Sequence, residues 1–293
     1  MIIKTYKELQ FYLEMFRNGN ADLMILEGPG GLSKSKMSAE IMKEQQHLRI
    51  VSHVSPMRLY SLGFENLNLP IIFEDTDCLL QNDSNIALLK MFTDTNEVKE
   101  INWYTSSSML DQENIPEKYE TRSKCLIICN SFDAVSDKIS ALRDRGIHIR
   151  FFPTTIEILN KMKEILPEVH KDLTTEEKLR VYYVIEKYAN VCDNLSLRTL
   201  VKGLALFKEC KNKGIEWQTL FLNNLELNQK LILLDSFMRQ YKKEEDRIKA
   251  WEDAGFSKRS YYDYRNKLNA KLQTTSENVC EAPLSQITCN PAN

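Results

Sequence analysis

A glycine-rich segment near the N-terminus has the composition of a phosphate-binding loop. The apolar residues 23–26 lead into a loop, residues 28–35, that ends in Lys34 and Ser35. Backbone N–H groups of such a loop can wrap around phosphate oxygens, and the helix expected to open at Ser33 or Lys34 points its positive end at the same anion. We therefore expect a nucleoside triphosphate, with Lys34 on its β/γ-phosphates and the Ser35 hydroxyl on Mg²⁺. The expected contact residues are Gly28, Pro29, Gly30, Gly31, Leu32, Ser33, Lys34 and Ser35.

One position departs from the usual pattern of such loops. Glycine normally precedes the lysine, and this chain has Ser33. A serine fits there if its φ is negative. Taken alone, the segment also suits an ordinary Gly/Pro turn between a strand and a helix.

A second apolar run ends in carboxylates, as a central strand does when it delivers acids to Mg²⁺ and to an attacking water. Residues 71–73 form the run, and Glu74 and Asp75 follow it. We expect Glu74 to hold the metal and Asp75 to polarise the water, which swaps the usual lengths of the two acids. A shift by one residue stays open, with Asp75 on the metal side and Asp77 nearer the water. The acids also suit a helix cap.

Further along the chain are an amide and two arginines that suit the same chemistry. Asn130 ends the buried-looking strand at residues 125–129, where its amide can orient water or touch the γ-phosphate. Arg143 and Arg145 end a helix, directly before an expected edge strand at residues 147–151. An arginine in that place can reach the γ-phosphate of a neighbouring subunit.

Another arginine stands at the start of a later helix. Ser196 is the expected N-cap and Arg198 lies in the first turn. First turns favour acids, so an arginine there indicates an anion nearby. By itself, Arg198 also suits an ordinary surface position.

In this order, the residues resemble the AAA+ ATPase family over about residues 20 to 225. The resemblance implies Walker A at residues 28–35, Walker B at 71–75, sensor 1 at Asn130, an arginine finger at Arg145 or Arg143, and sensor 2 at Arg198. Arg145 is the first choice because glycine and a strand follow it directly, as in the Ser-Arg-Cys segment of clamp-loader relatives. The family implies an α/β sheet domain with a helical lid, ATP and Mg²⁺ as ligands, and rings such as hexamers, or filaments, with ATP at subunit junctions.

The hydrophobic pattern predicts an α/β fold. Expected strands lie at residues 48–51, 71–73, 101–104 and 125–129, with a helix at 86–92 and a polar loop at 112–122. Such alternation implies a mostly parallel sheet with helices on both faces and a ligand at the carboxyl ends of the strands. Leu9, Tyr12, Leu13 and Phe16 recur at helical spacing and are expected to pack the first helix on the sheet. From residue 154 the pattern is helical, with a capping box at Thr174-Thr175-Glu176-Glu177.

The segment at residues 246–268 resembles the helix-turn-helix of bacterial and phage DNA-binding proteins, with a Gly turn and a Ser-capped second helix. The residues expected to face DNA are Lys258, Arg259, Ser260, Tyr262 and Arg265. Residues 227–271 hold eleven Lys/Arg and seven Asp/Glu, a net +4 that suits DNA. A helical hairpin that only packs or pairs subunits is the alternative.

Length and composition are those of an ordinary globular chain. The 293 residues are 27% charged and 43% hydrophobic, and the net charge of −2 excludes a globally basic nucleic-acid coat. No run is long enough to span a membrane, the start lacks the apolar core of a signal peptide, and seven cysteines without a CxxC pair indicate reduced thiols rather than a zinc site. The expected domains are a nucleotide-binding α/β domain at 1–153, a lid at 154–225, a helix-turn-helix at 226–271 and a disordered tail at 272–293.

We therefore expect an AAA+ ATPase that couples ATP hydrolysis to DNA replication of a phage or plasmid, as helicase, helicase loader or initiator. Expected partners are DNA, further copies of the chain, and a replicative helicase or other replication proteins, in the cytoplasm of a bacterial host or virus-infected cell and without a membrane. The alternative is an ATP-dependent DNA-binding switch that regulates transposition or transcription. A protein-remodelling chaperone would need pore-loop aromatics and gives no reason for a C-terminal helix-turn-helix.

Overall fold

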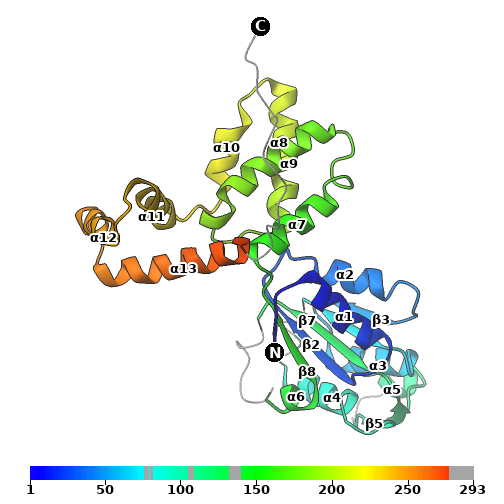
Figure 1. The fold of residues 1–293 in the computed structure, drawn as a ribbon. Helices are drawn as coiled ribbons and strands as arrows, with labels where there is room; N and C mark the ends of the chain where they lie inside the picture. The colour runs from blue at the N-terminus through cyan, green and yellow to red at the C-terminus, as the bar shows by residue number, and fades with distance from the viewer. Residues whose placement is uncertain (76–78, 80–81, 105–108, 132–139, 277–293) are drawn as a thin grey trace. The chain divides into compact units, whose positions relative to one another are not determined.

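The computed structural model describes residues 1–75, 79, 82–104, 109–131 and 140–276 (Figure 1). The chain divides into two compact units, Met1–Pro153 and Thr154–Asn293. The first unit is a sheet covered by helices, and the described part of the second unit is helical apart from its connecting segments.

A six-stranded parallel sheet forms the centre of the first unit, in the strand order β1-β8-β2-β7-β4-β3 (Figure 1). The strands are β1 (Ile2–Ile3), β2 (Leu23–Glu27), β3 (Leu48–Val51), β4 (Ile71–Glu74), β7 (Cys125–Cys129) and β8 (Ile147–Phe151). Every residue of β2 and β7 is buried, as expected for central strands that are covered on both faces. The predicted α/β class with a mostly parallel sheet is confirmed.

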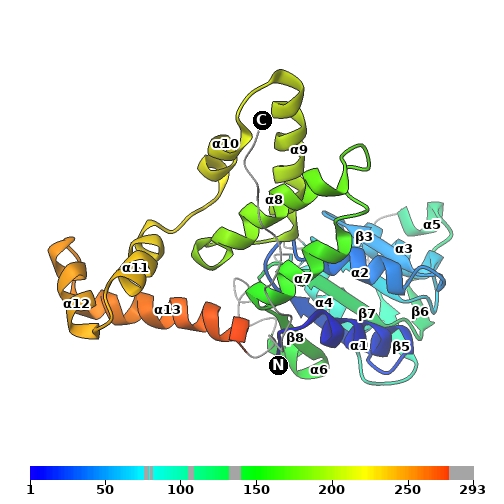
Figure 2. The ribbon, with the colours of Figure 1, turned by 45° about the horizontal axis from the view of Figure 1, so that its top comes forward.

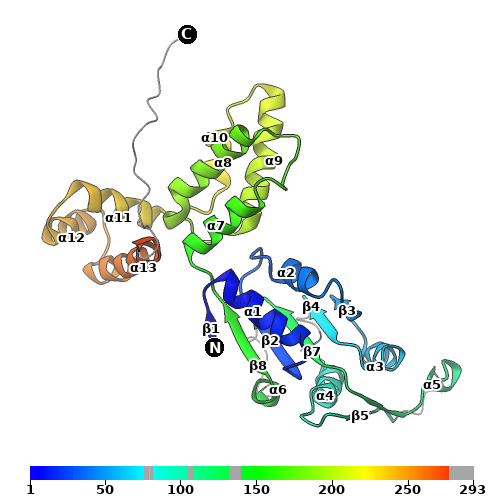
Figure 3. The ribbon, with the colours of Figure 1, turned by 45° about the vertical axis from the view of Figure 1, so that its right-hand side comes forward.

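Helices cover both faces of this sheet, as predicted (Figure 3). They are α1 (Tyr6–Arg17), α2 (Lys34–Ile41), α3 (Pro56–Glu65), α4 (Asp83–Phe92) and α6 (Ser140–Arg145). The four-residue helix α5 (Met109–Gln112) lies apart from this sheet (Figure 3). Successive residues of a strand point to opposite faces, so Leu23 and Ile25 share one apolar cluster with Leu88 of α4, whereas Met24 and Leu26 are buried against the other face.

The first helix buries a slightly different stripe from the one predicted. Leu9, Leu13 and Phe16 are buried as expected, but the fourth buried residue is Tyr6. Tyr12 is half-exposed, and its hydroxyl donates to Met1 Sδ at 2.9 Å. Tyr6 instead packs edge-to-face on Phe151, with ring centroids 5.2 Å apart.

The strand predicted at residues 101–104 does not belong to the parallel sheet. It is observed as β5 (Lys99–Asn102), which pairs antiparallel with β6 (Lys118–Thr121) in a separate two-stranded sheet. The prediction of a polar loop at 112–122 was therefore wrong for residues 118–121, whereas residues 113–117 do form a loop. In β6 the buried residues Tyr119 and Thr121 alternate with exposed charged residues, and such a half-buried strand contains no continuous apolar run.

The edge of the parallel sheet is also placed differently. β8 was expected to be an edge strand, but the two-residue strand β1 pairs with it, with Ile2 opposite Arg150. β8 therefore lies between β1 and β2. A strand of two residues is too short for its alternation to be recognised.

The second unit consists of consecutive helices (Figure 2). They are α7 (Thr155–Ile165), α8 (Thr175–Tyr188), the 3₁₀ turn η3 (Ala189–Val191), α9 (Leu197–Lys213), α10 (Trp217–Asn224), α11 (Gln229–Gln240), α12 (Glu244–Asp253) and α13 (Lys258–Ser276). The capping box predicted at the start of α8 is present, with Thr174 and Glu177 as its two members. No described helix is long and apolar enough to cross the hydrocarbon layer of a membrane.

The last three helices share an apolar cluster that is centred on Trp251 and Tyr261, both fully buried. Gly255 links α12 to α13 with a φ of +89°, a conformation that favours glycine. Helix α13 extends to Ser276, so the start of the segment predicted to be disordered is helical. Residues 277–293 of that segment lie outside the described residues.

Candidate nucleotide-binding site

The glycine loop connects the central strand β2 to helix α2. Gly28 is required by a close approach, because a Cβ atom there would lie 2.4 Å from the carbonyl oxygen of Phe151 at the end of β8. The Gly28 N–H donates to the Cys129 carbonyl at 3.2 Å, which also ties the loop to the end of β7. Gly31 has a φ of +78°. The loop is thus held by the carboxyl ends of both neighbouring strands.

Ser33 adopts a conformation that the sequence interpretation did not allow for. Its φ and ψ are 63° and 16°, in the left-handed region, and its side chain makes no capping hydrogen bond to α2. The condition of a negative φ is therefore not met. The chain needs a left-handed residue to turn from the loop into α2, and a serine in this conformation costs roughly 1–2 kcal/mol because Cβ crowds the following carbonyl oxygen.

Ser33→Gly is expected to stabilise the protein relative to Ser33→Ala by about 1 kcal/mol, since glycine adopts positive φ without this crowding. Denaturant unfolding of the two variants measures the difference, and the alanine variant controls for loss of the hydroxyl group. Equal unfolding midpoints would mean that the left-handed residue is not strained in the folded protein.

Lys34 lies at the centre of the loop. Its side chain is buried, and Nζ donates to the carbonyls of Gly28 at 2.6 Å and Pro29 at 2.8 Å. The ammonium group is therefore held where an anion bound by the loop would lie. Ser35 follows in the first turn of α2, whose N–H groups have no acceptors within the helix. A buried cation, the N-terminus of a helix and a glycine cradle together fit a nucleotide phosphate.

Two acids lie at the end of β4, Glu74 as its last residue and Asp75 directly after it, and they have different surroundings. Glu74 is buried and accepts two hydrogen bonds from Arg49 of β3, at 3.1 Å from Nε and 2.7 Å from Nη2. These bonds raise the pKa of Arg49 above its ordinary value. Asp75 is exposed, with a φ of +50°, and it has no hydrogen-bond partner within the described part of the chain. Asp77, the acid of the alternative register, lies outside the described residues.

The strand order brings three of the predicted elements together at the carboxyl ends of the parallel strands. β7 lies between β2 and β4, and Glu27 and Glu74 pair with the adjacent residues Cys129 and Ile128. The three strands therefore end at the same level. The glycine loop, the exposed Asn130 and Asp75 follow these ends directly, and Glu74 is the last residue of its strand.

Arg145 lies at the opposite side of the sheet, where the amino ends of the strands are. It ends α6 and precedes β8, and the neighbouring Gly146 packs so closely on Leu23, at the start of β2, that a Cβ would lie 2.6 Å from that side chain. β8 is five residues long, so Arg145 stands roughly 15 Å from its own glycine loop. Such an arginine can act on a nucleotide only if that nucleotide belongs to another subunit.

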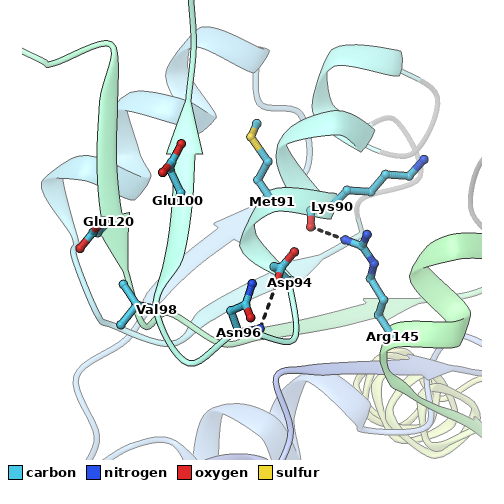
Figure 4. Close-up of a pocket in the computed structure, with 8 residues that line it drawn as sticks. All are labelled: Lys90, Met91, Asp94, Asn96, Val98, Glu100, Glu120 and Arg145. Carbon is cyan, nitrogen blue, oxygen red and sulfur yellow. Dashed lines mark hydrogen bonds between the residues drawn. The ribbon is translucent and has the colours of Figure 1, made fainter.

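Arg145 also lines a pocket of about 470 Å³ (Figure 4). Its Nη1 donates to the Lys90 carbonyl at 2.6 Å, and Asp94, Glu100 and Glu120 lie around the same pocket. Arg143, the other candidate, is half-buried.

Arg198 belongs to the second unit. Ser196 is the N-cap of α9, as predicted, and its backbone N–H donates to Thr199 Oγ1 at 3.3 Å. Arg198 is exposed in the first turn, without a partner among the described side chains.

A cluster of charged side chains around the buried Glu27, beside the loop, was missed in the sequence. Glu27, the residue before Gly28, is 3% exposed. His148 Nε2 lies 2.8 Å and Arg150 Nε 3.6 Å from Glu27 Oε2, and both side chains come from β8. The signal in the sequence that could have indicated this cluster was the alternation of His148 and Arg150 with apolar residues in β8. Arg49 was missed as well, because nothing in the sequence pairs it with Glu74.

The candidate DNA-facing residues of α13 divide into two groups. Lys258 and Arg259 are exposed at its N-terminus, without partners in the described structure. Ser260 accepts from Trp251 Nε1 at 3.0 Å and donates to the Ser257 carbonyl at 2.7 Å. Arg265 pairs with Glu244 and lies over the ring of Tyr262, 5.0 Å from its centroid. Ser260, Tyr262 and Arg265 therefore make contacts within the helices α11, α12 and α13, which we call the C-terminal module.

Comparisons with known proteins give a distant sequence relative and a fold. No family model matches the chain. An uncharacterised 36.7 kDa protein of Enterobacteria phage T4, from the nrdC–mobD intergenic region, is 23% identical over 203 residues. That match covers 62% of each chain, which is less than two thirds of the phage protein.

Among solved structures, a variant of Thermotoga maritima RuvB matches with a TM-score of 0.51 and 14% identity, over 92% of this chain and 86% of that one. The FIGL-1 AAA domain in complex with ADP matches over 71% and 70% of the two chains at 14% identity, with a TM-score of only 0.41. With its six-stranded parallel sheet and a glycine loop at the end of the central strand β2, the chain has the AAA+ P-loop fold.

Proposed function

We propose that this chain is an AAA+ ATPase that couples ATP binding and hydrolysis to work on DNA during replication of a phage or plasmid, as helicase, helicase loader or initiator. The buried ammonium of Lys34 at the centre of the glycine loop carries this proposal. The likeness to a phage T4 protein supports the phage setting.

In this proposal the loop N–H groups and Lys34 bind the phosphates, and Lys34 exchanges the Gly28 and Pro29 carbonyls for phosphate oxygens. Ser35 and Glu74 would hold Mg²⁺, which would supply positive charge to the phosphates when bound. Asp75 polarises the attacking water, and the Asn130 amide orients it. Arg198 contacts the nucleotide as the sensor of the helical unit.

A ring of subunits would place Arg145 on the nucleotide of a neighbour. The position of Arg145 at the amino ends of the strands, opposite its own loop, supports this arrangement. Arg145→Ala is expected to bind ATP normally and to hydrolyse it roughly 10³-fold more slowly. Adding Lys34→Ala subunits, which keep the arginine, should restore part of the activity.

Arg143→Ala is the matched control, because it removes the other arginine of the same short helix. A loss confined to Arg143→Ala would assign the finger to that residue. A wild-type ATPase rate per subunit that does not depend on protein concentration would contradict a shared site.

The positive charge of residues 227–271 supports DNA as the partner. Lys258→Ala/Arg259→Ala is expected to reduce the slope of log Kd against log salt by about two, since each phosphate contact contributes close to one. Fluorescence anisotropy with duplex DNA measures this slope. Lys208→Ala/Lys213→Ala on α9 removes two exposed lysines from another helix and should leave it unchanged. Unchanged affinity of the first variant at every salt concentration would make the module a packing or pairing hairpin.

Two observations favour the second candidate, a DNA-binding switch with slow hydrolysis for transposition or transcription. Ser33 replaces glycine at a left-handed position, and Arg49 holds both oxygens of Glu74. Both features would slow turnover. ATPase assays with single-stranded, double-stranded and forked DNA separate the two functions, because a motor is stimulated strongly by its substrate and a timer stays slow on all three.

A further inference from the structure

The segment between η3 and α9 contacts the C-terminal helices and leads directly into α9, the helix that carries Arg198. Asp193 lies in this segment, after η3 and before the N-cap Ser196. Its Oδ1 pairs with Lys267 Nζ of α13 at 2.9 Å, and its Oδ2 accepts from Asn228 Nδ2 at 2.8 Å. One carboxylate therefore fastens two different helices of the C-terminal module.

Each partner of Asp193 is itself fixed in the fold. Asn228 caps α11, because its Oδ1 accepts from the Leu231 N–H at 3.1 Å, and its own N–H donates to the Val191 carbonyl at 2.8 Å. One turn beyond Lys267, Lys271 Nζ donates to the Cys192 carbonyl at 2.6 Å. These contacts of Asp193 and the neighbouring backbone, which we call the joint, thus hold α11 and α13 to the same short stretch of chain.

The charge state of Asp193 suits this role. Burial opposes ionisation of the carboxyl group, but the hydrogen bonds from Lys267 and Asn228 outweigh it and hold the pKa of Asp193 below its ordinary value. The carboxylate is therefore ionised at neutral pH, and its pair with Lys267 is a pair of full charges.

Helix α13 links this joint to the proposed DNA contacts. It is continuous over 19 residues, with Lys258 and Arg259 at its start and Lys267 in its second half. At 1.5 Å per residue, Lys258 and Lys267 are roughly 14 Å apart along one rigid element. On the other side of the joint, α9 starts after Ser196 and carries Arg198 in its first turn.

We propose that Asp193 is a positioning residue through which DNA bound at the start of α13 sets the position of Arg198, and thereby the rate of ATP hydrolysis. This inference rests on the proposed function, since it needs a DNA-stimulated ATPase. It adds a specific coupling contact, the pair of Asp193 with Lys267, that neither the nucleotide site nor the DNA-facing residues require.

The test is a double-mutant cycle of Asp193→Ala, Lys267→Ala and the double variant, measured by ATPase rate without DNA and with saturating DNA. Each single variant is expected to lower the stimulation by DNA about fivefold, the lower end of typical coupling between sites. The double variant should lose no more than either single one, because both remove the same contact. The basal rate and the DNA affinity should stay within about twofold of wild type, and Asp193→Glu should restore part of the stimulation.

Asp235→Ala is the matched control. It removes an ion pair with Arg239 on α11 of the same module, away from the joint, and should leave the stimulation unchanged. Full stimulation in Asp193→Ala, or additive losses in the double variant, would overturn the inference while leaving the proposed function intact. A fall of the basal rate or of the thermal midpoint in step with the stimulation would make Asp193 merely structural and would also overturn it. A wild-type ATPase that DNA does not stimulate would refute the coupling to DNA in the proposed function, and the inference with it.

Discussion

Lys34→Ala is expected to abolish ATP binding and turnover, with the largest effect of any single change in this chain. It removes the one cation that the glycine loop itself supplies to the phosphates. Losing charge-assisted hydrogen bonds to the β- and γ-phosphates should weaken ATP affinity by at least about 100-fold. Titration with a fluorescent ATP analogue and a steady-state phosphate-release assay measure the two losses.

Folding has to be controlled in this experiment, because Lys34 also bonds two loop carbonyls in the protein without nucleotide. Thermal unfolding of the variant shows whether the unit is still folded. Lys36→Ala is the matched control, since Lys36 lies on the same helix but is exposed. Normal ATP affinity and turnover in a folded Lys34→Ala protein would rule out the phosphate-binding assignment.

The second large effect is expected at Asp75. Asp75→Asn should keep ATP bound and lower the rate of hydrolysis roughly 10²–10⁴-fold, the usual contribution of a general base. The amide keeps the shape of the side chain and loses the charge that polarises water. Single-turnover hydrolysis measured together with ATP affinity separates these two properties.

Glu74→Gln is the matched partner experiment. Glu74 is the acid that Arg49 holds, so its amide variant is expected to lose affinity for Mg²⁺-ATP and some stability as well. The opposite outcome, with binding lost in Asp75→Asn and only hydrolysis lost in Glu74→Gln, would assign the metal to Asp75 and the water to Glu74, and the proposed roles of the two acids would be wrong.

Most of the central sheet could be predicted from the sequence, because buried parallel strands are continuous apolar runs. β2, β4 and β7 were recognised in this way, and β3 was found at its observed bounds. The two-stranded sheet of β5 and β6 was missed in part because buried and exposed residues alternate along these strands, so neither strand contains a continuous apolar run.

The sequence by itself determined which residues could do the chemistry: the glycine loop with Lys34, the acids after β4 and Asn130 after β7. Residue types and their local spacing carry that information, since a strand and the loop that follows it are continuous in the chain.

Only the tertiary structure decided how distant residues meet. It placed Arg49 on Glu74, His148 on Glu27 and Asp193 on Lys267, three pairs that lie 25, 121 and 74 residues apart. It also placed Arg145 at the amino ends of the strands, away from its own loop, and gave Ser33 a left-handed conformation. Strand order, register and backbone dihedrals at a turn depend on packing across the whole unit, and no local pattern of residues encodes them.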